Sequence, residues 1–146
     1  MEYAQYTQIP EKDVLMGIFK LHESIFGDSK SLCNRMEKKS GLLINVALDG
    51  TKVVGYKIGY QLTKENFYSW LGGVHENYRN FGVASKLLGN QHTFLKENGY
   101  KIVQTKTKNK WRKMLILNIN NGFDVMDTYT DKNGETKIIL EKNLLD

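Results

Sequence analysis

The feature that most constrains the fold is a change in hydrophobic spacing at Gly41. Before Gly41, apolar residues recur at spacings of one, three and four, as on one side of a helix. After it they alternate with their neighbours, and two alternating runs within residues 42–60 flank an Asp49-Gly50 pair. That pair is a common turn between antiparallel strands. The segment therefore predicts a β-hairpin that follows helical chain.

The rest of the chain continues this mixed pattern. Helices are predicted over residues 11–26, 31–39, 82–98 and about 111–121, and further strands over residues 67–74, 101–105, 123–129 and 136–140. No repeat or linker interrupts the sequence. We therefore expect a single domain over residues 1–146, of α/β (α+β) class, with the element order α, α, β, β, β, α, β, α, β, β.

Composition narrows the class of protein. With 40% hydrophobic and 25% charged residues, the chain lies in the globular range. A single cysteine, Cys33, and three scattered histidines lack zinc-ligand spacing, so no metal is expected. The amino-terminal segment has no signal-peptide pattern and apolar runs are short, which predicts a cytoplasmic protein without a membrane span. A net charge of +5 predicts attraction to anions.

The most informative segment joins a strand to the helix predicted over residues 82–98. Arg79, Gly82 and Ala84 form an Arg-x-x-Gly-x-Ala string between them. Glycine lets the backbone approach a ligand closely, and the unpaired N–H groups of a helix start attract anions. This arrangement predicts a pyrophosphate-binding loop; the alternative is an ordinary helix entrance with a surface arginine.

On these residues the sequence resembles the GNAT superfamily of N-acetyltransferases, in which such a loop binds acetyl-CoA. A second similar segment begins at Asn109 and ends in Asn121-Gly122-Phe123. The resemblance implies a GNAT-like fold: a central mixed, mostly antiparallel sheet of about six to seven strands, flanked by about four helices. It also implies that strands 67–74 and 101–105 are parallel and splay apart, leaving a gap for the cofactor.

The resemblance implies acetyl-CoA as cosubstrate, with backbone N–H groups near Gly73 and Val74 holding the thioester oxygen as it gains charge. The implied cofactor-binding residues are Gly73, Val74, Arg79, Asn80, Phe81, Gly82, Val83, Ala84 and Asn109.

Two departures from the family pattern bear on mechanism. Glu76 replaces the usual proline before the loop, and Asn118 stands where many members have a tyrosine that protonates the leaving thiolate. An amide cannot act as that acid. Candidates for the general base are Glu76, His75, Glu23 and His22, and candidates for an acceptor-pocket wall are Tyr56, Tyr60, Trp70 and Tyr129. No catalytic residue is assigned.

The predicted function is direct transfer of an acetyl group from acetyl-CoA to a primary amine of an unidentified small molecule or peptide. The alternative is a non-catalytic CoA-binding sensor or partner module, favoured by Asn118 and the lack of an evident base. The basic residues within 101–113 keep a nucleic-acid binder open, although no nucleic-acid motif supports it. The exposed edge of the final strand leaves a homodimer open.

Overall fold

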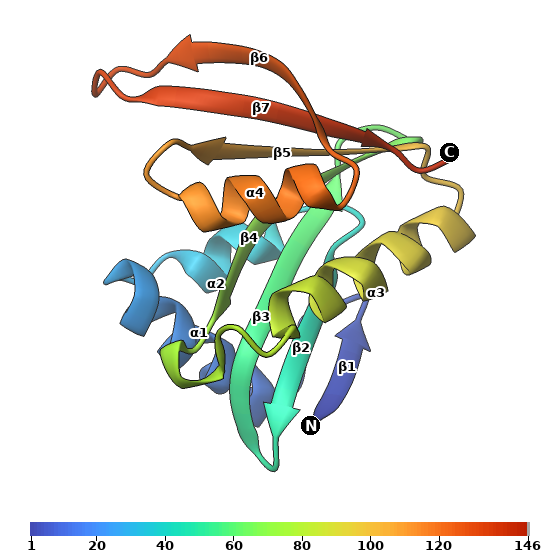
Figure 1. Cartoon of the computed structure of the whole chain (residues 1–146). Coiled ribbons are helices and arrows are strands. Elements are labelled where there is room, and N and C mark those ends of the chain that lie inside the picture. Colours follow the sequence, from blue (N-terminus) through green and yellow to red (C-terminus); the bar gives the residue numbers. More distant parts are fainter. Residues whose placement is uncertain (146) are drawn as a thin grey trace.

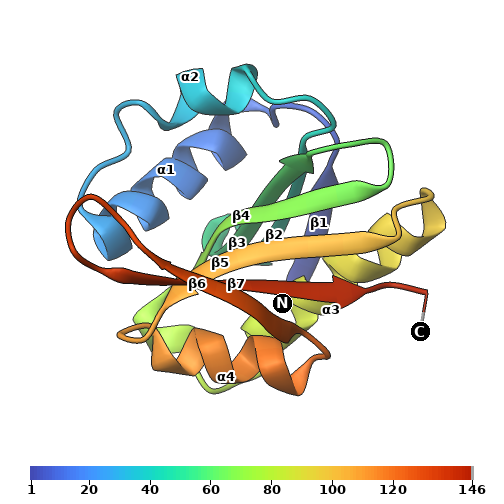
Figure 2. The same ribbon diagram turned by 90° about the horizontal axis from the view of Figure 1, so that it is seen from above.

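The computed structural model of the protein describes residues 1–145 and shows a mixed seven-stranded sheet between two pairs of helices (Figures 1 and 2). The sheet order is β1-β2-β3-β4-β5-β7-β6. In chain order the elements are β1 (Glu2–Tyr6), α1 (Lys12–Phe26), α2 (Leu32–Glu37), β2 (Leu43–Asp49), β3 (Lys52–Gln61), β4 (Asn66–Val74), a 3-10 turn (Glu76–Tyr78), α3 (Val83–Glu97), β5 (Ile102–Lys108), α4 (Arg112–Asn120), β6 (Asp124–Thr130) and β7 (Thr136–Asn143).

The expected fold class is confirmed. The structure has one strand more than the hydrophobic spacing predicts. Every helix and strand predicted from spacing is present, and its ends differ from the predicted ones by only a few residues. The missed element is β1, which pairs antiparallel with β2 from Glu2↔Leu48 to Tyr6↔Ile44. It is a five-residue edge strand of mixed polar and aromatic residues, so it carries little apolar alternation to reveal it.

One face of the sheet is covered by α1 and α2 (Figure 2). Alternate residues of the predicted hairpin point into this layer, where they meet Ile18 of α1 and Met36 of α2, both fully buried. The hairpin residues in this cluster are Leu42, Ile44, Val46, Val53, Tyr56 and Ile58. Leu42, Ile44 and Val46, and likewise Tyr56 and Ile58, share this face because successive strand side chains point to opposite sides. Val53 joins them where the β2–β3 register shifts between Ala47 and Leu48.

The opposite face is covered by α3 and α4 (Figure 2). Leu88 and Leu95 of α3 pack with Phe67 and Val103 of the sheet and with Phe123, which follows α4. Burying each such side chain contributes about 1.5–3 kcal/mol, and the two helices are thereby fixed on either side of the β4–β5 junction.

The carboxyl-terminal strands extend beyond this helical cover. β7 lies between β5 and β6 and pairs antiparallel with both, so the exposed edge expected of the final strand belongs instead to β6, every residue of which is exposed. Within the described residues, none of the helices combines the length and the apolar character needed to cross a bilayer.

Candidate functional site

The sheet opens between β4 and β5, its one parallel strand pair. Only four residue pairs join these strands, from Asn66↔Ile102 to Ser69↔Thr105, and the Thr105 hydroxyl donates to the Ser69 carbonyl at 2.9 Å. Trp70 follows at once and opposes no residue of β3, which makes it a bulge. Because a bulge bends its strand, the second half of β4 departs from β5. The expected splay between these strands is present.

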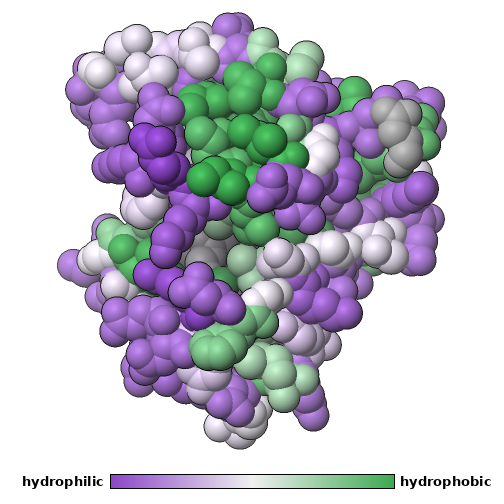
Figure 3. All heavy atoms as spheres, viewed as in Figure 1, coloured by the Kyte–Doolittle hydropathy of each residue, from purple (hydrophilic) through white to green (hydrophobic). Residues whose placement is uncertain are grey.

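A narrow cavity of about 20 Å³ lies beside this opening, enough for about one water molecule. Figure 3, which is viewed as Figure 1 is, shows a hollow near the centre of this view, between α4 and the start of α3. The lining residues come from four elements and are Tyr56, Lys57, Gly72, Gly73, Val74, Ala84, Leu87, Met114 and Leu117. Of the residues expected to bind cofactor, the cavity brings together Gly73, Val74 and Ala84. We call the splayed strands and this cavity the cleft.

The two adjacent glycines of β4 serve opposite faces. A Cβ on Gly73 would stand 2.5 Å from Cδ1 of Ile25 in α1, so a larger residue there would require the end of that side chain to move. A Cβ on Gly72 would instead stand 3.7 Å from Cγ of Lys57. Gly72, which was not among the expected binding residues, therefore lies on the face that carries Lys57.

The loop after β4 leads directly into α3 and is held at several points. The Arg79 Nε donates to the Val74 carbonyl at 3.0 Å, and the Tyr78 hydroxyl donates to Asp49 in the β2–β3 turn at 2.5 Å. Asn80 and Gly82 both adopt left-handed backbone, with φ of 69° and 81°. These contacts fix the direction in which α3 starts.

The start of α3 is open to a ligand. A Cβ on Gly82 would meet no atom within 4 Å, and the first turn of α3 carries no acidic residue. Within the described chain, no hydrogen bond engages the N–H groups of residues 83–85, as is usual at a helix start. Arg79 lies exposed beside them. Backbone donors and a guanidinium at one helix end form an arrangement that attracts phosphate groups.

The other expected binding residues occupy different settings. Phe81 is 79% exposed, whereas Val83 is buried against Ala47, Val54 and Leu87. The Val83 side chain therefore serves the core, and only its backbone N–H is available to a ligand. Asn109 lies exposed in the turn between β5 and α4 and does not line the cavity.

The candidate acids and bases do not converge on the cleft. Glu23 and Glu76 are exposed, and the His75 ring accepts from the Asn77 N–H at 3.1 Å. His22 is buried, with Nδ1 2.5 Å from the Tyr56 hydroxyl. Burial, followed by the charge of Arg35, lowers the pKa of His22, and burial raises the pKa of Tyr56. His22 thus has a structural partner.

Of the four candidates for the wall of an acceptor pocket, one lies in the core and three lie at or near the surface. Tyr56 belongs to the α1/α2 core. Tyr60 packs edge-on against Trp70 at 5.6 Å, with the Lys39 ammonium 4.3 Å from the Tyr60 ring centre. Tyr129 lies on the exposed strand β6, where Lys106 reaches its ring. Tyr60, Trp70 and Tyr129 therefore remain available at the surface, and Tyr56 does not.

Asn118 is buried in α4 with 3% exposure. Met114 and Leu117 of the same helix line the cavity, and Asn118 does not. The position that carries the acidic tyrosine in the resemblance is therefore occupied by an amide outside the cavity lining.

The charged residue of the cavity, Lys57, is not among the binding residues that the sequence predicts. Lys57 of β3 stands opposite Gly72 of β4 and Asn45 of β2. Burial lowers the pKa of its ammonium to about 8. Lys57 is the charged residue within 53–60, and it alternates with the core residues Tyr56 and Ile58, so spacing alone does not mark it as part of a cavity.

Several polar atoms near Lys57 are buried without a hydrogen-bond partner within the described structure. They are Asn45 Oδ1, both amide atoms of Gln91 and His92 Nε2. His92 Nδ1 lies 3.1 Å from the Lys142 ammonium. Burial, with the positive charges of Lys142 and Lys57, lowers the pKa of His92 to about 3, so this ring is neutral at pH 7.

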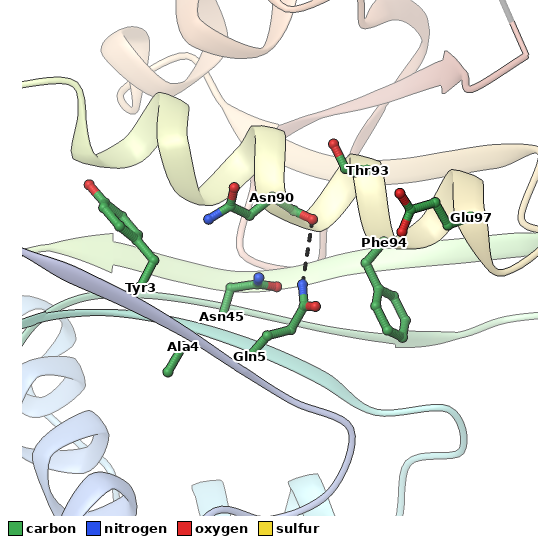
Figure 4. Close-up of a pocket in the computed structure, with 8 residues that line it drawn as sticks. All are labelled: Tyr3, Ala4, Gln5, Asn45, Asn90, Thr93, Phe94 and Glu97. Atoms are coloured by element: carbon green, nitrogen blue, oxygen red, sulfur yellow. Dashed lines mark hydrogen bonds between the residues drawn. The ribbon is translucent and has the colours of Figure 1, made fainter.

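A larger hollow of about 290 Å³ lies elsewhere, between β1 and α3 (Figure 4). Its lining is Tyr3, Ala4, Gln5, Asn45, Asn90, Thr93, Phe94 and Glu97, with the Gln5 amide donating to the Asn90 carbonyl at 3.5 Å. None of the expected binding residues lies here. Its lining carries a carboxylate and no cation, so it is poorly suited to a polyphosphate. The cleft, although smaller, combines the open strand edge with the helix start.

Three of the basic residues within 101–113 are paired with carboxylates. Lys101 pairs with Glu65, and Lys108 and Lys110 pair with Glu135. Partial neutralisation by these carboxylates weakens the argument for a nucleic-acid face. Among the residues that the structure describes, no group of three or more His, Cys, Asp or Glu side chains is arranged to hold a metal ion.

Comparisons with known proteins detect similarity through structure alone. No family model and no curated protein sequence matches the chain. An aminoglycoside 6′-N-acetyltransferase complexed with coenzyme A superposes with a TM-score of 0.84 at 12% identity, over 100% of this chain and 98% of that one.

Two further solved structures show the same similarity. A GNAT family acetyltransferase from Elizabethkingia anophelis with acetyl-CoA bound has a TM-score of 0.75 at 18% identity, over 97% of both chains. A chain of the NatC complex bound to Gag peptide and CoA has a TM-score of 0.78 at 16% identity, over 98% of this chain and 99% of that one. At these identities the comparisons establish the fold.

Proposed function

Since the chain has the fold of the GNAT acetyltransferases, we propose that it is an acyl-CoA-dependent N-acetyltransferase. It transfers the acetyl group of acetyl-CoA directly to a primary amine of a small molecule or peptide. The observation that carries this proposal is the meeting of the β4–β5 opening with the unpaired N–H groups at the start of α3.

The proposed binding mode follows from that geometry. The pyrophosphate lies against the N–H groups of residues 83–85 and the Arg79 guanidinium, which are donors without a competing carboxylate in the first turn of α3. The pantetheine arm enters the cleft between Ala84 and Met114, whose apolar surfaces suit its chain. Gly73 and Val74 then present backbone to the thioester, with Asn80, Phe81 and Asn109 at the exposed outer rim.

Neighbouring structures support acyl-CoA as the donor and an amine as the acceptor. One is named as an aminoglycoside N-acetyltransferase with coenzyme A, and another holds a peptide together with CoA. These two differ in acceptor class while sharing the fold, so fold does not choose between them for this chain. Direct transfer requires no covalent enzyme intermediate, which agrees with the absence of a catalytic thiol among the residues lining the cleft.

The first test is the thermal midpoint of unfolding with and without acetyl-CoA, with ATP as the anion control. Ligand at a hundredfold excess over its dissociation constant stabilises the fold by about 2.7 kcal/mol. For a domain of this size the midpoint rises by several degrees. Acetyl-CoA raises it and ATP at the same concentration raises it less; no rise at millimolar acetyl-CoA would contradict the proposal.

Matched variants locate the binding. Gly82→Glu, alone and with Arg79→Ala, abolishes the acetyl-CoA shift because it adds a carboxylate where phosphate is to lie. Gly99→Glu is the control: Gly99 follows α3 at its far end, also has positive φ (86°), and also has open space around its Cβ position. The Gly99→Glu variant carries the same backbone strain and is expected to keep the rise in thermal midpoint on addition of acetyl-CoA. Equal loss in both variants would assign the effect to strain.

The second candidate is a CoA-binding sensor without turnover. The specific observation that favours it is the burial of an amide at position 118, outside the cavity lining. Release of free CoA thiol from acetyl-CoA across a panel of amines decides between the two. Acceptor-dependent release establishes the transferase, and binding without release by any amine of the panel establishes the sensor.

A further inference from the structure

The cleft contains one ionisable nitrogen, that of Lys57. Among the residues that line the cavity, Lys57 alone carries a formal charge at neutral pH. Its Cγ lies 3.7 Å from where a Cβ of Gly72 would stand, an ordinary contact distance, so the Lys57 side chain lies beside Gly72. Gly72 immediately precedes the Gly73-Val74 backbone proposed to hold the thioester.

The Lys57 ammonium has no counter-charge in the part of the chain that the structure describes, where no carboxylate lies within 4 Å of it. β2 contributes the neutral Asn45, α4 contributes Met114 and Leu117, and β4 contributes glycine. The titratable group from α3 is His92, and Lys142 of β7 reaches that ring. Lys57 is half-buried, and an ammonium partly removed from water without a partner is costly, so a negative charge formed in the cleft would offset that cost.

Breaking the thioester forms such a charge, on sulfur. The residue at 118 does not supply a proton, since it is an amide outside the cavity lining. Burial also holds the pKa of the phenol of Tyr56 above its usual range, which makes that group a weaker acid. Lys57 is the remaining proton carrier of the cleft.

We propose that Lys57 protonates the sulfur of coenzyme A as the thioester breaks, an inference that rests on the proposed acetyltransferase function. The neutral amine nitrogen of the acceptor bonds to the carbonyl carbon. The bond from that carbon to sulfur then breaks, its electron pair stays on sulfur, and the ammonium transfers a proton there. The acceptor nitrogen loses its proton to water, and Lys57 regains one from solvent. The products are an amide and the free thiol.

The proton affinities of the two groups suit this transfer. A lysine near pKa 8 is close to the value of about 8.5 of an ordinary thiol. Proton transfer between groups of similar pKa is efficient near neutral pH. An unperturbed lysine would hold its proton more tightly, so burial of Lys57 improves it as a donor.

The decisive experiment titrates the thiol of coenzyme A bound to the full protein, followed by thiolate absorbance in the ultraviolet. A nearby ammonium favours the thiolate, so the bound thiol in the native protein titrates below the free one, which would place the Lys57 ammonium beside the sulfur; turnover of Lys57→Arg tests the proton transfer itself. Lys57→Met removes the downward shift. Lys142→Met is the matched control: it removes a half-buried lysine bonded to His92 that does not line the cavity, and it retains the shift.

The outcomes separate this proposal from the proposed function. Identical thiol titration in the native protein and Lys57→Met, with coenzyme A bound to both, overturns the role of Lys57 and leaves the transferase standing. Failure of the native protein to bind coenzyme A overturns both. Thermal melts establish folding, and Lys57→Met is expected to melt no lower than the native protein because it removes an unpartnered buried charge.

Turnover with an amine accepted in the panel gives the second measurement. Lys57→Arg keeps the charge but does not release a proton near neutral pH. Lys57→Arg and Lys57→Met both lower kcat by about a hundredfold or more, with KM for acetyl-CoA little changed. Full kcat in Lys57→Arg would overturn proton donation. Acetylation of Lys57 itself, detected by mass spectrometry, would make it an acceptor and would also overturn the proposal.

Discussion

The two faces of the sheet bury side chains of different character. Under α1 and α2 the buried cluster is apolar, and its polar pair, His22 and Tyr56, is joined by a hydrogen bond. Under α3 and α4 the sheet also buries leucines, yet among them lie Lys57, the orphaned amides of Asn45 and Gln91, and His92.

This difference separates stability from function within one sheet. A buried polar group without a hydrogen bond costs about 1–3 kcal/mol, and native structures keep few of them. Here they gather on the face that carries the cleft. We therefore interpret the α1/α2 face as the layer that stabilises the fold. On the α3/α4 face, the buried polar groups lower the stability, and this is the face that carries the candidate site.

The largest expected effect comes from making the apolar face resemble the polar one. Met36 of α2 is fully buried. Met36→Gln loses about 1.5–3 kcal/mol of apolar burial and adds the cost of an unpaired amide, so the free energy of unfolding falls by about 3–5 kcal/mol. Denaturant titration measures this fall in the free energy of unfolding. A loss below about 1 kcal/mol would show that this face tolerates polar groups as well as the other does.

A smaller effect is the acid sensitivity of the α3/α4 face. His92 has a folded pKa of about 3, below the unfolded value of about 6.5, so the unfolded chain binds the proton more tightly. Its contribution is complete above about pH 6.5 and is lost as pH falls towards 3, by up to about 1.4 kcal/mol per pH unit.

Urea denaturation at a series of pH values between 7 and 4 tests this assignment to His92. His92→Gln reduces the slope of stability against pH in that window. His75→Gln, which alters a partly exposed histidine in the loop after β4, keeps it. An unchanged slope in His92→Gln would place the acid sensitivity elsewhere.

The smallest expected effect comes from replacing a buried polar side chain by an apolar one on the α3/α4 face. Both side-chain polar atoms of Gln91 are buried without partners, so Gln91→Met removes an unpaired amide while conserving volume. The free energy of unfolding is expected to rise by about 1 kcal/mol. A fall of similar size would show that Gln91 is satisfied by water and that the two faces differ less than the contacts indicate.

The sequence predicted most of the fold because its hydrophobic periods are unambiguous. The hairpin of β2 and β3 and the long helices α1 and α3 are read directly from spacing. β1 could not be read so easily, because its residues owe their strand conformation to pairing with Leu48 through Ile44 rather than to their own pattern.

The candidate site was predictable in part for the same reason. The glycine and arginine of the loop are local features, and the structure brings Gly73, Val74 and Ala84 to one cavity. Lys57 was not predictable, because its importance comes from three elements that meet over it: the bulged strand β4 and the helices α3 and α4. Likewise, only the packing of α1 shows that a side chain at position 73 would meet Ile25.

The placement of β7 between β5 and β6 has a consequence for the order of folding during synthesis. Residues 136–143 bridge two strands that precede them in the chain and do not pair with each other. While a ribosome is still adding these residues, β6 has no neighbour and β5 has one open edge. The amino-terminal strands can pair earlier, since β1 to β4 are linked to their neighbours in order. The cleft, which needs β5 and α4 in place, is therefore expected to be completed late.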